Sequence, residues 1–121
     1  MTKRILVVED QEDNRQILRD LLANAGYEMI EAEDGQQALT QAAAHKPDLI
    51  LMDIQLPLLD GYEATRRIKA DPALNAIPII VVTSYALSGD EEKAHAAGCD
   101  AYVAKPFSPR ALLAKIREYL P

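Results

Sequence analysis

Three runs of the sequence are apolar without interruption, and they restrict the possible folds more than any other feature. They cover residues 5–8, 49–52 and 77–82, the last of which contains Pro78. Runs of this kind are typical of strands in a parallel sheet, where both faces are buried. Two further stretches, residues 28–32 and 101–104, mix polar and apolar side chains. We expect these two to be edge strands.

Helical patterns separate the apolar runs. An amphipathic helix of about three turns, ending at Gly26, is predicted by apolar residues at positions i, i+1, i+4, i+5 and i+8. These are Ile17, Leu18, Leu21, Leu22 and Ala25. Further helices are predicted at residues 36–44, 62–70, 90–97 and 109–120. Ser108 and Pro109 suit the N-cap and the first position of the last helix.

Strands and helices therefore alternate along the whole chain, which is typical of an α/β fold. Parallel strands joined by right-handed helical crossovers place helices on both faces of the sheet. The chain contains no linker, internal repeat or low-complexity segment. We expect residues 1–121 to form a single domain, without a separate output domain.

Charge and composition exclude several classes of protein. The chain has 13 Lys plus Arg against 19 Asp plus Glu, a net charge of -6, which argues against nucleic-acid binding. No run approaches the roughly 18 apolar residues of a membrane helix, and the N-terminal apolar run is too short for a signal peptide. We therefore expect a cytoplasmic protein without membrane contact. Cys99 is the only cysteine and is interpreted as a small buried hydrophobe; His45 and His95 lack metal-ligand spacing.

Polar residues that can do chemistry stand where the predicted strands end. They are Glu9 and Asp10, Asp53, Thr83 and Ser84, and Lys105. Each one alone could equally begin a helix, start a turn or cap a helix. In open α/β sheets, however, functional groups gather beyond the carboxyl ends of the strands. We therefore expect these residues to share one crevice.

Together these residue types point to phosphoryl transfer. Carboxylates at Glu9, Asp10 and Asp53 would repel one another unless a cation lies between them. Mg²⁺ suits a site with few protein oxygens and room for phosphate. A carboxylate beside such an ion can attack phosphorus. Lys105, with a hydroxyl of Thr83 or Ser84, then supplies donors for the phosphoryl oxygens, so the predicted reaction is phosphoryl transfer to Asp53.

Four motifs give the sequence a family resemblance over essentially its whole length. They are ILVVED, DLILMDIQLPLLDG, IPIIVVTS and AYVAKPF. In their order and spacing the chain resembles response-regulator receiver domains of the CheY-like superfamily, in particular the stand-alone ones. The resemblance implies a flavodoxin-like (βα)5 three-layer sandwich with a five-stranded parallel sheet of order 2-1-3-4-5.

The resemblance also assigns roles to individual residues. Asp53 is similar to the phosphoryl acceptor, Asp10 to the direct metal ligand and Glu9 to the acid that reaches the ion through water. The backbone carbonyl of Gln55 is a further expected ligand, and the expected cofactor is Mg²⁺ or Mn²⁺. At position 9, Glu lengthens the acid by one methylene relative to Asp, which alters its distance to the ion.

A second set of roles concerns the conformational switch. Thr83 is similar to the hydroxyl that moves to the phosphoryl group, with Ser84 beside it, and Lys105 to the cation that pairs with that group. Tyr102 is similar to the aromatic residue that turns inward when Thr83 moves. A cis peptide is expected before Pro106.

The implied function is that of a two-component response regulator that catalyses only its own phosphorylation and dephosphorylation. The expected donor is a sensor histidine kinase or a histidine phosphotransfer protein. The expected output surface is the fourth helix, fifth strand and fifth helix, with His95, Tyr102, Pro109 and Arg110, which binds a downstream protein or forms a homodimer. Bulky residues at Gln55 and Tyr85 predict a long-lived phosphoryl group; a half-life of seconds, unchanged in Gln55→Asn, would contradict this.

Several alternatives remain open at the level of sequence. The chain could act as a phosphate sink or phosphorelay intermediate rather than as a signal. A small aspartyl-phosphate phosphatase would need a second Asp where Gln55 stands. A flavodoxin-like cofactor binder would need a phosphate loop after the first strand, where the chain instead has acidic residues. A pseudo-receiver adaptor would not need Asp10, Asp53, Thr83 and Lys105 together.

Overall fold

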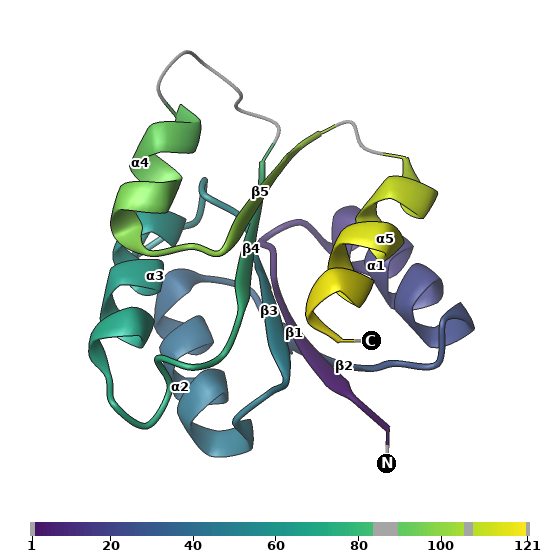
Figure 1. The fold of residues 1–121 in the computed structure, drawn as a ribbon, viewed down its shortest axis with the longest axis horizontal. Coiled ribbons are helices and arrows are strands. Elements are labelled where there is room, and N and C mark those ends of the chain that lie inside the picture. Colours follow the sequence, from purple (N-terminus) through teal and green to yellow (C-terminus); the bar gives the residue numbers. More distant parts are fainter. Residues whose placement is uncertain (1, 84–89, 106–107, 121) are drawn as a thin grey trace.

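The computed structural model describes residues 2–83, 90–105 and 108–120. Within them five strands alternate with five helices (Figure 1). The strands are β1 (Arg4–Val8), β2 (Glu28–Ala32), β3 (Leu49–Met52), β4 (Ile79–Thr83) and β5 (Ala101–Ala104). The helices are α1 (Glu12–Asn24), α2 (Gly35–His45), α3 (Gly61–Ala70), α4 (Asp90–Ala97) and α5 (Pro109–Tyr119). The predicted alternation is confirmed.

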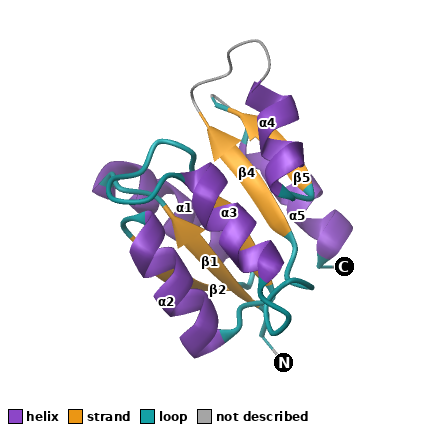
Figure 2. Cartoon of the chain, turned by 90° about the vertical axis from the view of Figure 1, so that its left-hand side faces the viewer, coloured by secondary structure: helices purple, strands orange, loops and turns teal. Residues whose placement is uncertain are grey.

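The strands form one parallel sheet in the order β2-β1-β3-β4-β5. Helices α1 and α5 cover one face, and α2, α3 and α4 cover the other (Figures 1 and 2). This is the flavodoxin-like three-layer sandwich that the family resemblance implied. Strand order reverses next to β1, so the ends of β1 and β3 form the crevice where such sheets place their functional groups.

The two faces of the sheet explain why the central strands are apolar throughout. In β1, Leu6 and Val8 belong to the core beneath α2, α3 and α4, whereas Ile5 and Val7 belong to the core beneath α1 and α5. Alternate side chains of a strand point to opposite faces. Every position of such a strand must therefore be apolar when helices cover both faces.

The outer strands are less buried, as predicted. The first four residues of β2 are exposed or half-buried, and β5 is buried only at Ala101. All residues of β3 and β4, by contrast, are buried. The mixed polarity of residues 28–32 and 101–104 therefore reflects their positions at the two edges.

The structure differs from the predicted third apolar run at its start. Strand β4 begins at Ile79 and not at position 77. Pro78 has no N–H to donate to a neighbouring strand, although its carbonyl accepts a hydrogen bond of 2.9 Å from the Ile50 N–H. The apolar run is therefore longer than the strand, which extends to Thr83.

Helix α1 also differs from its predicted apolar face. Ile17 is 59% exposed, while Leu18 and Leu22 are buried. The third buried residue of α1 is Arg15. The buried stripe thus follows the spacing i, i+3 and i+7, and Ile17 lies outside it. Gly26, with φ of 88°, follows the helix as predicted.

The remaining predictions about single residues concern structure and not chemistry. Cys99 is buried, and burial, followed by Asp100, raises the pKa of its thiol to about 11; this fits a small buried hydrophobe. His45 and His95 are exposed. In the described part of the chain, no helix has the length and apolar character needed to cross a membrane.

Candidate phosphoryl-transfer and metal site

The residues predicted to share a crevice come from the carboxyl ends of the four strands β1, β3, β4 and β5. Glu9 and Asp10 directly follow β1, and Asp53 directly follows β3. The Asp53 N–H donates a 3.1 Å hydrogen bond to the carbonyl of Val8, which fixes the two strand ends side by side. Thr83 ends β4, and its carbonyl accepts a 2.7 Å bond from the Lys105 N–H.

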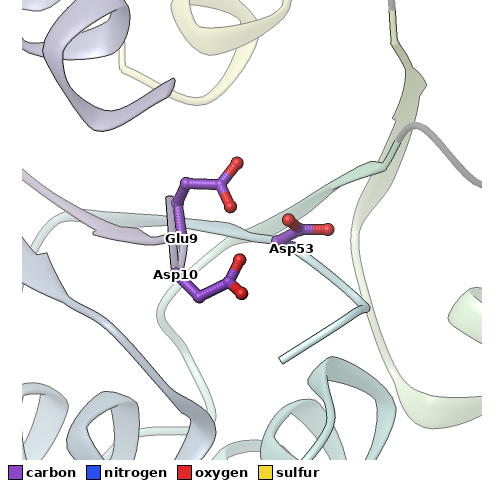
Figure 3. Close-up of side chains that lie close together, drawn as sticks. All are labelled: Glu9, Asp10 and Asp53. Carbon is purple, nitrogen blue, oxygen red and sulfur yellow. The ribbon is translucent and has the colours of Figure 1, made fainter. Parts of the chain in front are cut away.

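Three carboxylates converge at this edge of the sheet. Glu9, Asp10 and Asp53 each offer an oxygen, and these oxygens lie within 4.8 Å of one another. Figure 3 shows Glu9 and Asp10 extending in different directions from one strand end, with Asp53 beside them. Glu9 is buried, Asp53 is half-buried and Asp10 is exposed. The cluster therefore opens to solvent on the Asp10 side.

Lys105 supplies the positive charge of the site. Its Nζ lies 2.7 Å from Glu9 Oε1 and 3.7 Å from Asp53 Oδ2. The side chains of Lys105, Glu9 and Asp53 are 17%, 3% and 12% exposed. In this structure the lysine is thus closest to the longer acid. The extra methylene of Glu9, whose effect the sequence left open, allows a direct ion pair with Lys105.

The acids of the cluster differ in their pKa values. Burial, opposed by Lys105 but assisted by Glu9, raises the pKa of Asp53 to about 7. Burial also raises the pKa of Asp10, and the neighbouring Glu9 adds to this. For Glu9, burial works in the same direction, but the hydrogen bond and the positive charge of Lys105, with smaller contributions from Asp53 and Asp10, outweigh burial and lower the pKa.

This electrostatic arrangement fits a divalent cation. A single lysine does not neutralise three carboxylates, and Glu9 adds to the rise in the pKa of Asp53 that burial causes. Oxygen-only ligands are those preferred by Mg²⁺ and similar hard cations. A cation bound here would favour the ionised form of Asp53, which is the form that can act as a nucleophile.

The start of α3 fixes the backbone of Asp53. Asp60 caps the helix by accepting a 2.9 Å hydrogen bond from the Glu63 N–H. A Cβ on the next residue, Gly61, would lie 2.0 Å from the carbonyl oxygen of Asp53. Only glycine allows this close approach. The Asp60-Gly61 pair was part of the motif that carried the resemblance, but its steric role was not predicted from the sequence.

Sequence reasoning missed one residue of the site altogether. Arg15, on the buried stripe of α1, donates a 2.7 Å hydrogen bond from Nη1 to the carbonyl of Glu9. The signal was present in the sequence, because Arg15 precedes Leu18 and Leu22 at helical spacing on the same face. A charged residue at a position that should be apolar points to a partner in the core.

The other predicted residues are placed less fully. Thr83 is buried, and half-buried Tyr102 packs against the core beneath α2, α3 and α4. The Gln55 side chain is exposed, and its backbone carbonyl remains a predicted ligand.

On the expected output face, His95, Pro109 and Arg110 are exposed. Ser84, Tyr85 and Pro106 lie outside the described residues.

Comparison with known proteins decides the family. A family model described as the response regulator receiver domain matches residues 5–117. The chain belongs to this family. It is a receiver domain of the two-component response regulators, a class that interacts with histidine kinases or phosphotransfer proteins and with downstream targets.

Similar proteins support this assignment over the full length. The polar-differentiation response regulator DivK of Brucella ovis is 48% identical over 120 residues, which are 99% of this chain and 98% of that protein. Among solved structures, the receiver domain of sensor histidine kinase PA1611 from Pseudomonas aeruginosa PAO1 has a TM-score of 0.92 and 39% identity, covering 99% and 98% of the two chains. That receiver domain has a magnesium ion coordinated in its active-site cleft.

A chemotaxis protein shows the same architecture. CheY4 of Vibrio cholerae has a TM-score of 0.91 and 28% identity, with 98% of this receiver domain and 99% of CheY4 covered. The resemblance to the CheY-like superfamily, and to its stand-alone regulators, is thereby confirmed.

Proposed function

We propose that this receiver domain accepts a phosphoryl group on Asp53 in a reaction that depends on Mg²⁺ or Mn²⁺. One observation carries the proposal: Glu9, Asp10 and Asp53 converge within 4.8 Å, and Lys105 lies 3.7 Å from Asp53 on the same crevice. Residues 1–121 act as one receiver unit in this proposal. The domain catalyses its own phosphorylation and dephosphorylation and no further reaction.

The cation would be held by oxygen atoms alone. Asp10 and Asp53 supply carboxylate ligands, the backbone of Gln55 supplies a carbonyl, and Glu9 acts through water. When bound, the cation neutralises negative charge that gathers on the phosphoryl oxygens. The magnesium ion of the PA1611 receiver domain supports this choice of metal.

Asp53 is the nucleophile of the proposed reaction. One of its carboxylate oxygens forms a bond to phosphorus while the bond between phosphorus and the donor breaks. The donor atom, a histidine nitrogen of a kinase or phosphotransfer protein, keeps the electron pair of that bond. The 2.7 Å hydrogen bond from the Ile54 N–H to Asp53 Oδ1 leaves Oδ2 as the oxygen nearer to Lys105.

Lys105 and Thr83 contact the phosphoryl group once it is on Asp53. Lys105 can exchange its contact with Glu9 for one with a phosphoryl oxygen on Asp53, because both acids lie within 4 Å of Nζ. The hydroxyl of Thr83, with Ser84 beside it, moves to the same group, and Tyr102 turns inward in response. New contacts of this kind bias a two-state element.

The signal then passes to another protein through α4, β5 and α5. The exposed side chains of His95, Pro109 and Arg110 support an output surface there. The partner is a downstream protein or a second copy of the chain. The same chemistry would serve a phosphate sink or phosphorelay intermediate. No role in nucleic-acid or membrane binding is proposed, and the proposed location is the cytoplasm.

The decisive experiment is phosphorylation of Asp53→Asn with a small phosphodonor and Mg²⁺. The intact mass of the wild-type protein should rise by one phosphoryl group, and that of the variant should not, because an amide is not a nucleophile at neutral pH. Asp13→Asn, which changes an exposed acid near the site in sequence, is the matched control and should be labelled like the wild type. If Asp53→Asn gains the same mass, Asp53 is not the acceptor.

A further inference from the structure

We propose that Arg15 is a positioning residue for the cation site, which it controls through the backbone of Glu9. This inference rests on the proposed function, since it concerns the same site. Among the described residues, Arg15 bonds to Glu9, Glu12, Glu31 and Glu33 and not to Asp10 or Asp53. Its effect would come from fixing the segment that carries Glu9 and Asp10.

The peptide groups of Glu9 are held from two sides. The Glu9 N–H donates a 3.0 Å hydrogen bond to the carbonyl of Ala32 at the end of β2. Its carbonyl accepts the 2.7 Å bond from Arg15 Nη1, which is buried. The backbone of residue 9 sets the directions in which the side chains of Glu9 and Asp10 point. Loss of the Arg15 bond would leave a buried carbonyl unpaired and the segment less fixed.

Arg15 is itself held by three acids. Its Nε lies 3.2 Å from Glu31 of β2, and Nη2 lies 3.3 Å from Glu33 beyond β2 and also contacts Glu12 of α1. The Arg15 side chain is only 7% exposed. A planar guanidinium with several bonded nitrogens has little freedom. The carbonyl of Glu9 is therefore bonded to a donor that cannot easily move.

Arg19 provides a matched control within the same network. It lies one helical turn further along α1 and bonds to Glu12, Gln16 and Glu31. It thus shares two of the acids that hold Arg15, but its described bonds do not include the carbonyl of Glu9. A comparison of the two arginines separates the carbonyl contact from the ion pairs.

The sign of the expected effect distinguishes positioning from simple charge. Removal of a positive charge near a cation site strengthens cation binding by Coulomb's law. Without Arg15, Glu33 would lose the counter-charge described here, and Glu12 and Glu31 would keep only Arg19. If Arg15 positions the ligands, its removal weakens binding instead. Loss of a residue that orients metal ligands typically lowers metal affinity by at least about tenfold.

The experiment measures Mn²⁺ affinity from the EPR signal of the free ion in wild type, Arg15→Met and Arg19→Met. We expect about a tenfold loss in Arg15→Met, and for Arg19→Met a change of less than about twofold. Equal or tighter binding by Arg15→Met would overturn the inference, and so would an equal loss in both variants. Urea unfolding in EDTA shows whether each variant is folded.

Two further variants keep the test decisive if Arg15→Met does not fold. Arg15→Lys and Arg19→Lys retain the charge but lose the planar fork, and only Arg15→Lys should weaken Mn²⁺ binding. Equal affinities in these two variants would overturn the inference. Absence of Mn²⁺ binding by the wild-type protein would overturn both this inference and the proposed metal site, whereas normal wild-type binding with an unaffected Arg15→Met overturns the inference alone.

Discussion

Two neighbouring acids of the site respond to the fold in opposite ways. Lys105 is closer to Glu9 than to Asp53, at 2.7 Å against 3.7 Å, so the pKa of Glu9 falls while burial, less well compensated, raises that of Asp53 to about 7. Near neutral pH without a cation, Asp53 is therefore partly protonated. A protonated carboxyl is a poor nucleophile, so in the proposed reaction a bound cation would increase the reactivity of Asp53 by favouring its ionised form.

The raised pKa of Asp53 predicts how stability changes with pH. The folded protein holds the Asp53 proton up to about pH 7, whereas an unfolded Asp releases it near pH 4. Between these values the folded state binds more protons, so the Asp53 contribution to the free energy of unfolding falls as pH rises. Removal of this acid in Asp53→Asn should raise stability relative to wild type by about 2–4 kcal/mol more at pH 8 than at pH 4.

The measurement is urea unfolding of both proteins in EDTA across this pH range. Glu9 has the opposite linkage, because its lowered pKa adds stability that is lost as pH falls through the folded value. The comparison with Asp53→Asn, and not the wild-type curve alone, therefore isolates Asp53. A stability difference that is constant from pH 4 to pH 8 would show that the pKa of Asp53 is not raised.

At the scale of elements, the contact between α3 and the end of β3 sets the position of Asp53. The Gly61 N–H donates a 2.9 Å hydrogen bond to the Ile54 carbonyl. A Cβ at position 61 would meet both the Asp53 carbonyl oxygen at 2.0 Å and the Ile54 Cα at 2.8 Å. These neighbours are backbone atoms, which cannot turn aside as a flexible side chain can.

Gly61→Ala should therefore damage both stability and the site. We expect a loss of about 3 kcal/mol from overpacking, together with weaker Mn²⁺ binding, because the Asp53 backbone must shift. Gly26→Ala is the control. Its Cβ would meet nothing within 4 Å, so it should lower the free energy of unfolding only by the cost of a positive φ, about 1 kcal/mol. Urea unfolding and Mn²⁺ titration of both variants test this. Unchanged Mn²⁺ affinity in Gly61→Ala would refute the coupling between α3 and Asp53.

Sequence patterns were sufficient to predict the helices and strands, but not to predict which side chains of every element are buried. Residues 28–32 and 101–104 coincide with β2 and β5, because edge position and mixed polarity have the same cause. The pattern wrongly placed Ile17 on the buried face of its helix, since an apolar residue on a helix can remain exposed to solvent at modest cost. The apolar run begins before the strand because Pro78 has no N–H to donate, and the apolar character of a residue does not indicate whether it can donate a hydrogen bond.

The sequence was sufficient to predict which residues belong to the site, but not which contacts they make. The positions of Glu9, Asp10, Asp53, Thr83 and Lys105 follow from where the strands end. Which acid Lys105 contacts depends on side-chain length and on the packing of β5, neither of which a pattern contains. The contacts of Arg15 include Glu31 of β2, which is distant in sequence, and therefore required the structure.

At the scale of the whole molecule, part of the net charge of -6 is concentrated at one edge of the sheet. Three of the acids each offer an oxygen, and these oxygens lie within 4.8 Å of one another; burial raises the pKa values of Asp10 and Asp53, and the neighbouring Glu9 adds to both rises. The fold brings these groups together against their repulsion. A ligand that relieves the repulsion must stabilise the folded state.

Mg²⁺ should accordingly raise the free energy of unfolding. At a free concentration 100 times its dissociation constant the gain is about 3 kcal/mol. Asp10→Asn should lose most of this gain, yet in EDTA it should be at least as stable as wild type, because one repelling acid is gone. Urea unfolding with Mg²⁺ or EDTA at constant ionic strength measures both effects. An equal gain from Mg²⁺ in the two proteins would rule out Asp10 as a ligand.

The ion pair between Lys105 and Glu9 joins residues 96 positions apart. A ribosome releases Glu9, Asp10 and Asp53 well before Lys105, and β5, which places the lysine, is the last strand to be synthesised. A nascent chain therefore carries the acids of the site without their counter-charge. Under the proposed function, the lysine that pairs with the phosphoryl group would therefore become available only after the last strand has been synthesised.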